Sequence, residues 1–219
     1  MFKNMFNLVN LFTVPVVKVF IDPKLYNKSH IIDTVEQNYN QSNYRNNWDK
    51  KSKLHHYYED WDNGLFKQID FSSLIPVYSD IFTNFVNNIP SIETLEFKFE
   101  IANVTVYKNK GDYMDVHHHM IETTTFACVH YINVGKNSGP LRFLNPASVS
   151  KFLSKPILDL RDKKLDLQDT FNSFACEYYD INMGEDEMII FPSFLLHGVK
   201  QEKSDKKLRI AIATNLSLF

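Results

Sequence analysis

The spacing of apolar residues changes near residue 94, and this change limits what the second half of the chain can form. Between residues 95 and 101, Leu, Phe, Phe and Ile alternate with charged residues, which is the period-two pattern of a strand with one buried face. Further short strands are predicted, separated by turn sequences rich in Gly, Asn and Pro. They cover residues 103–107, 114–119, 124–133, 141–144, 176–181, 187–191 and 208–216. Short strands at this spacing favour a sandwich or a barrel over alternating strands and helices.

The earlier part of the chain has a helical pattern. Pro23 is placed to open a helix that continues to Val35, since proline is favoured in a first helical turn. A second helix is predicted over residues 74–89, where apolar residues recur every three or four positions before a proline. A strand over residues 11–20 precedes both helices, and the polar stretch 41–64 between them favours a long loop.

We therefore predict one mainly β domain with helices, of the α+β class. Residues 1–93 form an N-terminal strand and helical support region, and residues 94–219 form the β core. The charged, leucine-containing stretch 147–174 interrupts the predicted strands. It is expected to be a helical or irregular insertion in that core.

Composition excludes several classes of protein. The chain has 219 residues, 44% of them apolar, and a net charge of −2, so it is neither disordered nor strongly basic, and nucleic acid is not a favoured partner. The sequence has no run of about 18 apolar residues and no signal-peptide cleavage site, so no membrane partner is expected. Cys128 and Cys176 are far apart, which favours two reduced thiols. We expect a soluble, intracellular protein of the cytoplasm.

Three consecutive histidines carry the strongest chemical signal. On a strand, residues i and i+2 point to the same face, so His117 and His119 can share a face while His118 points away. His197 follows a strongly apolar strand, at the position where a barrel strand would end. Imidazoles that converge suit Fe, Zn, Cu or Ni, whereas a single histidine on an apolar stretch is more often a hydrogen-bonded core residue. Asp115, two residues before His117, offers a second possible pair.

One arginine stands out in a chain that uses lysine for most of its positive charges. Only four of the 24 basic residues are Arg, and Arg209 lies between Leu208 and Ile210 on a predicted apolar strand. A guanidinium there suits a buried carboxylate, because its forked N–H groups match two carboxylate oxygens. The alternative is an arginine that faces water from an edge strand.

Together these motifs resemble the Fe(II)- and 2-oxoglutarate-dependent oxygenases, in their prolyl-hydroxylase-like branch. Within that branch the chain is similar to a group, many of them from bacteria and phages, with His-x-His in place of His-x-Asp. The resemblance covers about residues 95–219 and touches residues 11–15. Its most specific stretch, residues 184–199, has a turn glycine, an apolar strand and the pattern F-P-S-x-x-x-H-x-V. Looser matches are residues 102–107, 110–112, 129–133, 139–143 and 208–215.

The resemblance implies a double-stranded β-helix core, a jelly roll of cupin-like type, with the N-terminal helices packed on it. It also implies six site residues. Those for catalysis and for Fe(II) are His117, His119 and His197, and those for 2-oxoglutarate are Arg209, Tyr107 and Tyr131. The implied enzyme is a dioxygenase that uses O2 to hydroxylate an unidentified small molecule or protein side chain and releases succinate and CO2.

The departure from His-x-Asp leaves alternatives open. His119 stands where the family usually has a carboxylate, which leaves the metal one charge more positive, and Asp115 or Glu122 could complete the ligand set instead. Three histidines would also suit a zinc enzyme of cupin-like type. A jelly roll that has lost turnover would be a binding or structural protein. A dimer is one expectation for the assembly, and a phage-infected host is one for the setting.

Overall fold

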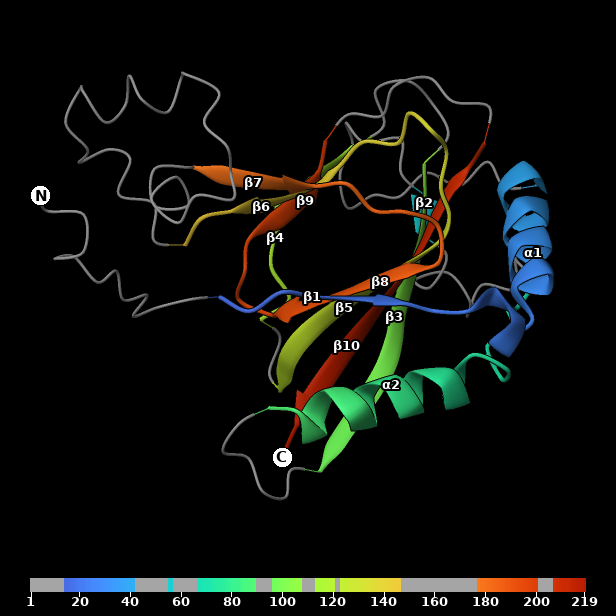
Figure 1. The fold of residues 1–219 in the computed structure, drawn as a ribbon. Helices are drawn as coiled ribbons and strands as arrows, with labels where there is room; N and C mark the ends of the chain where they lie inside the picture. Colours follow the sequence, from blue (N-terminus) through green and yellow to red (C-terminus); the bar gives the residue numbers. More distant parts are fainter. Residues whose placement is uncertain are drawn as a thin grey trace, which may run out of the picture.

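Two antiparallel sheets make up most of the computed structural model (Figure 1). It describes residues 14–41, 55–56, 67–89, 96–107, 113–120, 123–146, 177–200 and 207–219.

The larger sheet has six strands in the order β1-β8-β5-β10-β3-β2. Its long central strands β5, β10 and β3 run side by side, and the short strands β1 and β2 lie at its two edges (Figure 1). In chain order the bounds are β1 Val17–Phe20, β2 His55–His56, β3 Phe97–Tyr107, β5 Thr124–Asn133, β8 Glu187–Pro192 and β10 Arg209–Leu218.

The smaller sheet has four strands in the order β4-β9-β6-β7. Their bounds are β4 Met114–His117, β6 Leu141–Leu144, β7 Tyr178–Ile181 and β9 His197–Val199. Apolar side chains from both sheets meet between them in a single cluster, with Ile189 and Ala211 from the larger sheet and Leu141 and Phe143 from the smaller. This arrangement confirms the predicted mainly β fold with a jelly-roll core.

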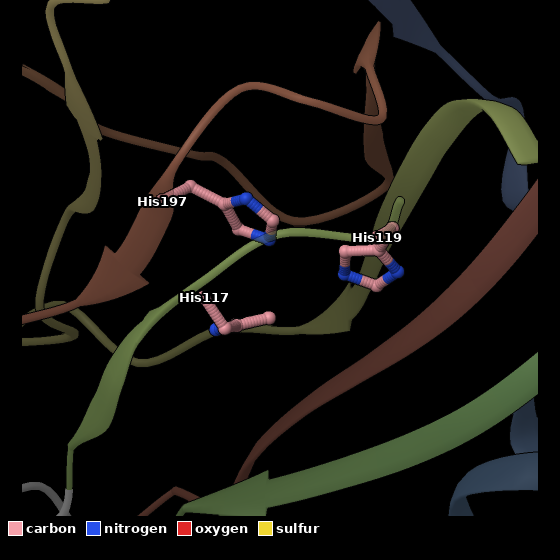
Figure 2. A group of neighbouring side chains, drawn as sticks. All are labelled: His117, His119 and His197. Atoms are coloured by element: carbon pink, nitrogen blue, oxygen red, sulfur yellow. The ribbon is translucent and has the colours of Figure 1, made fainter. Parts of the chain in front are cut away.

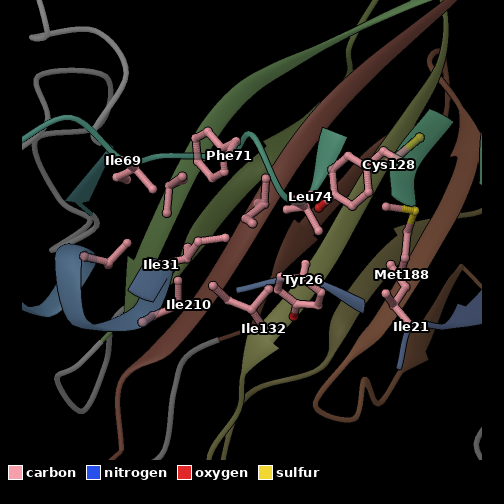
Figure 3. Close-up of a cluster of buried hydrophobic side chains, with 14 of the residues drawn as sticks. Ile21, Tyr26, Ile31, Ile69, Phe71, Leu74, Cys128, Ile132, Met188 and Ile210 are labelled. Atoms are coloured by element: carbon pink, nitrogen blue, oxygen red, sulfur yellow. The ribbon is translucent and has the colours of Figure 1, made fainter. Parts of the chain in front are cut away.

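Helices cover the outer face of the larger sheet, as predicted. Helix α1 spans Lys28–Gln41 and follows the short 3-10 helix η1, Pro23–Leu25, while α2 spans Ile75–Asn87. Side chains of both helices join the sheet in one buried cluster (Figure 3). Of the helices in the described ranges, none is long and apolar enough to span a membrane.

Side chains of the central strands alternate between the two faces of the larger sheet, except on β3 between Ile101 and Val104, where the pairing with β10 shifts register. On β3, Val104 and Val106 face the helices and belong to the outer cluster, whereas Tyr107 belongs to the cluster between the sheets. On β10, Ile210 and Ile212 face the helices while Ala211 faces inward. Because strand side chains alternate with a period of two, each central strand supplies one face to the hydrophobic core and the other face to the space between the sheets.

Some element boundaries differ from the prediction. The two strands expected over residues 95–101 and 103–107 form one continuous strand, β3, whose pairing with β10 shifts register between Ala213 and Thr214. Pro23 opens the short helix η1, and the long helix begins only at Lys28. Pro23 does begin a helical turn, as proline at a first helical position favours. The predicted helix was wrong in its start, because this turn is a separate short helix.

Two differences concern the candidate metal ligands. The strand expected over residues 114–119 ends at His117, so His119 lies beyond it. His197 does not end a strand but begins β9, which belongs to the other sheet from the apolar strand β8.

The N-terminal region is tied into the β core by two of its strands. β1 pairs with β8, and β2, inside the stretch predicted to be loop, pairs with β3. Residues 11–13 of the predicted first strand and the whole insertion at 147–174 lie outside the described residues. Cys128 is a free, buried thiol and lies on the helix side of the sheet, whereas Cys176 lies outside the described residues, so the prediction of two reduced thiols stays a prediction for Cys176.

Candidate metal centre

Three histidine side chains converge between the two sheets. His117 is the last residue of β4, His197 is the first of β9, and the two are opposite each other in the antiparallel pairing. His119 approaches from just beyond β4 (Figure 2). One ring nitrogen of each histidine lies within 4.8 Å of the others, so the three together could hold a metal ion.

The backbone around these residues explains their convergence. The N–H of His119 donates to the carbonyl of Ser193 at 2.8 Å, which holds the end of β4 against the turn before β9. Gly198, next to His197, allows β4 and β9 to approach closely, because a Cβ atom there would lie 2.8 Å from the carbonyl oxygen of Met114. The site therefore depends on contacts between segments that are far apart in the sequence.

Each of the three rings is oriented by a hydrogen bond from Nδ1. His117 Nδ1–H donates to the carbonyl of Asp115 at 2.8 Å, and His197 Nδ1–H donates to that of Leu195 at 2.8 Å. His119 Nδ1–H donates to the side-chain oxygen of Asn215 at 3.1 Å. An oxygen acceptor at Nδ1 keeps the proton there, so the Nε2 lone pair of each neutral ring is left for a metal.

His118, between two of these histidines, has the opposite arrangement. The backbone N–H of Met120 donates to His118 Nδ1 at 3.3 Å. In the neutral ring the proton then sits on Nε2, which therefore has no lone pair to offer a metal. His118 is also exposed, and it is not part of the converging group.

Burial keeps the three converging histidines neutral. Desolvation is the largest cause that lowers the pKa of His117 to about 4 and that of His197 to about 3, and it also lowers the pKa of His119. Their mutual repulsion as cations adds to the effect. Neutral imidazole is the form that binds a metal, so at neutral pH the group needs no deprotonation to do so.

The three histidines line a cavity of about 250 Å³, and the other predicted site residues line it as well. Arg209 is the first residue of β10 and is only 2% exposed. Its guanidinium carbon lies 5.0 Å from the centre of the Tyr107 ring and 4.9 Å from that of Tyr131, and its Nη1–H donates to the carbonyl of Gly139 at 2.9 Å. The structure thus brings together all six predicted residues.

The alternative carboxylate ligands have a different placement. Asp115 is exposed and lines a separate depression with Arg142 and Lys200, and its backbone carbonyl accepts the hydrogen bond from His117. Glu122 lies outside the described residues.

Sequence reasoning missed Asn215 as a member of the site. It lines the cavity and contacts His119, and it lies six residues after Arg209 on β10. An even spacing on a strand places two residues on the same face, which was the available signal. The bond to His119 depends on tertiary contacts that no local pattern shows.

Comparison with known protein families gives one match. Residues 104–215, just over half of the chain, match the family described as "Putative 2OG-Fe(II) oxygenase". No curated protein sequence matches the chain.

Solved structures show the same fold at low sequence identity. A prolyl hydroxylase from Trichoplax adhaerens, in complex with a peptide fragment of hypoxia inducible factor, is 13% identical with a TM-score of 0.55, over 92% of this chain and 83% of that one. A prolyl-4-hydroxylase from Pseudomonas putida is 11% identical with a TM-score of 0.51, over 94% and 93%. The α-ketoglutarate-dependent carbocyclase SnoK of nogalamycin biosynthesis is 8% identical with a TM-score of 0.56, over 93% and 79%.

These findings confirm the family that the sequence motifs resemble. Its members are enzymes that use Fe(II), 2-oxoglutarate and O2. The donor set found here, three neutral imidazoles beside a buried guanidinium, fits a divalent metal together with a carboxylate ligand. The chain belongs to the 2OG-Fe(II) oxygenase family.

Proposed function

We propose that His117, His119 and His197 hold Fe(II), and that the enzyme hydroxylates a small molecule or a protein side chain with release of succinate and CO2. The single observation that carries the proposal is that the three Nε2 lone pairs and the buried Arg209 guanidinium share one cavity. When bound, the metal supplies the O2-dependent oxidation. The protein residues bind, orient and shield the reactants.

Arg209 is proposed to bind the far carboxylate of 2-oxoglutarate. Its guanidinium is desolvated and held between two aromatic rings, with one N–H donated to Gly139. A buried cation of this kind is stabilised by an anion, and a forked donor matches a carboxylate. The hydroxyls of Tyr107 and Tyr131 lie on side chains that line the same cavity and are proposed to contact the same carboxylate.

Charge supports a dianionic cosubstrate. Three imidazoles are neutral, so the proposed iron keeps its two positive charges, and Arg209 adds a third. In the common set of two histidines and one carboxylate, the ligands would remove one of these charges. 2-Oxoglutarate carries two negative charges at neutral pH, and opposite charges in a desolvated cavity attract strongly.

The substrate is proposed to present a compact group to the metal. The cavity of about 250 Å³ must also contain the cosubstrate, which leaves room for a side chain or a small part of a larger molecule. One structural relative is a prolyl hydroxylase in complex with a peptide fragment, and another is a carbocyclase of nogalamycin biosynthesis. Both kinds of substrate, a peptide side chain and a small molecule, are therefore included in the proposal.

Anaerobic addition of 2-oxoglutarate to the Fe(II)-loaded protein tests the proposal. We expect a visible charge-transfer absorption band, and formation of succinate when air is admitted. Zinc-loaded protein is the control and should give neither. A protein that binds Fe(II) but shows no band and no succinate would overturn the proposal. Tight binding of zinc with no response to 2-oxoglutarate would favour the zinc enzyme instead.

A further inference from the structure

The three converging histidines differ in what orients their rings. His117 and His197 each donate to a backbone carbonyl two residues earlier. A residue of any type at those earlier positions would supply the same carbonyl. His119 instead donates to the side chain of Asn215, 96 residues away in sequence. Among these three orientating bonds, only that of His119 therefore depends on the identity of another side chain.

His119 is also less supported by secondary structure than its two partners. His117 and His197 face each other in the ladder between β4 and β9, whereas His119 lies beyond the end of β4. Its backbone is held by the bond from its N–H to Ser193. That bond fixes the backbone but does not itself set the side-chain torsions, so the orientation of the ring depends on contacts made by the side chain.

Strand β10 places Asn215 where it can provide this contact. Asn215 is half-buried and lines the cavity on the face of β10 that carries Arg209. Its neighbour across the β5 ladder is the small residue Ala127. β10 thus contributes Arg209 near its start and Asn215 toward its end to the same cavity.

We propose that Asn215 is a positioning residue for the metal centre, holding the ring of His119 so that Nε2 faces the other two histidines. An amide oxygen can only accept, so the bond keeps the proton of His119 on Nδ1. Partners of this kind orient metal-binding histidines, and their loss costs about 10- to 100-fold in metal affinity. The inference rests on the proposed function, because it needs the three histidines to bind a metal.

Titration with Co(II) alone tests the role of Asn215 without any need for turnover. Asn215→Leu keeps the side-chain size but removes the acceptor, and we expect about 10- to 100-fold weaker Co(II) binding. Asn215→Asp keeps an acceptor, and its affinity should equal or exceed that of the wild type. Ser217→Ala is the matched control on β10, at the next position of the same face, and should bind Co(II) as the wild type does. Melting temperatures without metal show whether each variant is folded.

Proton NMR of the Co(II) protein separates a positioning role from a merely structural one. A histidine bound through Nε2 retains an exchangeable proton on Nδ1, and the paramagnetic metal shifts its signal strongly. We expect three such signals in the wild type and in Ser217→Ala. In Asn215→Leu one of them should be lost by exchange with water, and in Asn215→Asp one should move.

Two results would overturn the positioning role of Asn215. Wild-type Co(II) affinity and three unchanged signals in Asn215→Leu would show that the ring of His119 needs no partner. If Asn215→Leu does not fold, three signals at unchanged positions in Asn215→Asp would overturn it equally. A wild-type protein that does not bind Co(II) would instead overturn the proposed function, so the two failures are distinguishable.

Discussion

Two buried histidines, His130 and His197, lie on opposite sides of the larger sheet and behave differently despite their similar burial. His130 projects from β5 toward the helices, and its Nδ1 shares a hydrogen bond of 2.9 Å with the hydroxyl of Tyr78. His197 lies between the sheets and faces two further imidazoles. Burial is the largest cause that lowers the pKa of both, to about 3 in each case.

The comparison shows that burial and a lowered pKa do not identify a ligand. His130 packs edge-on against the rings of Tyr26 and Tyr78, with ring centres 5.7 and 5.8 Å away, and among the described residues its Nε2 has no hydrogen-bond partner. It is a core histidine. His197 differs because its Nε2 converges with other lone pairs in a cavity. Convergence of ring nitrogens in a cavity therefore distinguishes the proposed metal ligand from the core histidine.

Substitution of each histidine in turn should give the largest difference between the two, and the difference should appear in metal affinity. His197→Ala removes one of three proposed ligands, and we expect Co(II) affinity to fall at least about 100-fold and 2-oxoglutarate-dependent succinate formation to be lost. His130→Leu should keep Co(II) affinity within about threefold, since no proposed ligand touches it. Metal titration and a succinate assay check both. Equal losses of metal affinity in the two variants would contradict the distinction.

Acidification should lower the stability of the protein through the core histidine, His130. Above pH 6.5, His130 is neutral in both the folded and the unfolded chain. As the pH falls below 6.5, the unfolded chain takes up a proton that the folded chain resists until its pKa of about 3. The free energy of unfolding should therefore fall between these values, with His130 contributing on the order of a few kcal/mol.

Urea unfolding of the metal-free protein between pH 7 and pH 4 measures this loss. The histidines of the metal centre add to it in the wild type, because their pKa values are also lowered. The double variant Tyr78→Phe/His130→Leu isolates the share of His130 and should lose less stability on acidification. Identical pH slopes for the two proteins would show that His130 is not held neutral by the fold.

The cosubstrate end of the cavity should respond separately from the metal end. Arg209→Leu removes the proposed partner of the far carboxylate, and we expect 2-oxoglutarate to bind about 10- to 100-fold more weakly, as for the loss of a charged hydrogen bond. Co(II) affinity should stay unchanged. Arg209→Lys keeps the charge but loses the fork, so its affinity for 2-oxoglutarate should be intermediate. Calorimetric titration of the metal-loaded proteins gives both constants, and unaltered 2-oxoglutarate binding in Arg209→Leu would remove Arg209 from the proposed site.

The sequence predicted the regular parts of this fold well. The bounds of β5 and β6 agree with the prediction, because their apolar runs are bounded by clear turn sequences. The three-residue strand β9 was missed, since the apolar run from β8 continues through the turn into it. Strand geometry also gave an incomplete reason for the convergence of His117 and His119, because the strand ends between them and a bond to Ser193 completes the placement.

The residues of the candidate site could be named from the sequence, but the contacts that hold them in place could not. Consecutive histidines and an arginine on an apolar strand stand out in a sequence. Asn215 is one of many asparagines, and its contact with His119 forms only in the folded protein. His130 lies inside the matched stretch 129–133, but on β5 it faces the helices whereas its neighbours Val129 and Tyr131 face the space between the sheets. The pairing of the strands sets which face of a sheet a side chain points to, whereas the local sequence shows only that side chains alternate between faces.

The smallest expected effect lies on the helix side of the sheet and concerns the hydroxyl of Tyr78. Tyr78→Phe keeps the ring packed against Phe82 and His130 but leaves His130 Nδ1 without its partner. A buried polar atom left unsatisfied costs about 1–3 kcal/mol, so unfolding at pH 7 should become easier by about that amount. In the double variant Tyr78→Phe/His130→Leu neither polar atom remains, and most of this loss should be recovered. Co(II) affinity should be the same in both variants, because the sheet separates this pair from the cavity. Losses of unfolding free energy that simply add in the double variant would mean that Tyr78 and His130 stabilise the fold independently. A changed Co(II) affinity would mean that the two faces of the sheet are coupled.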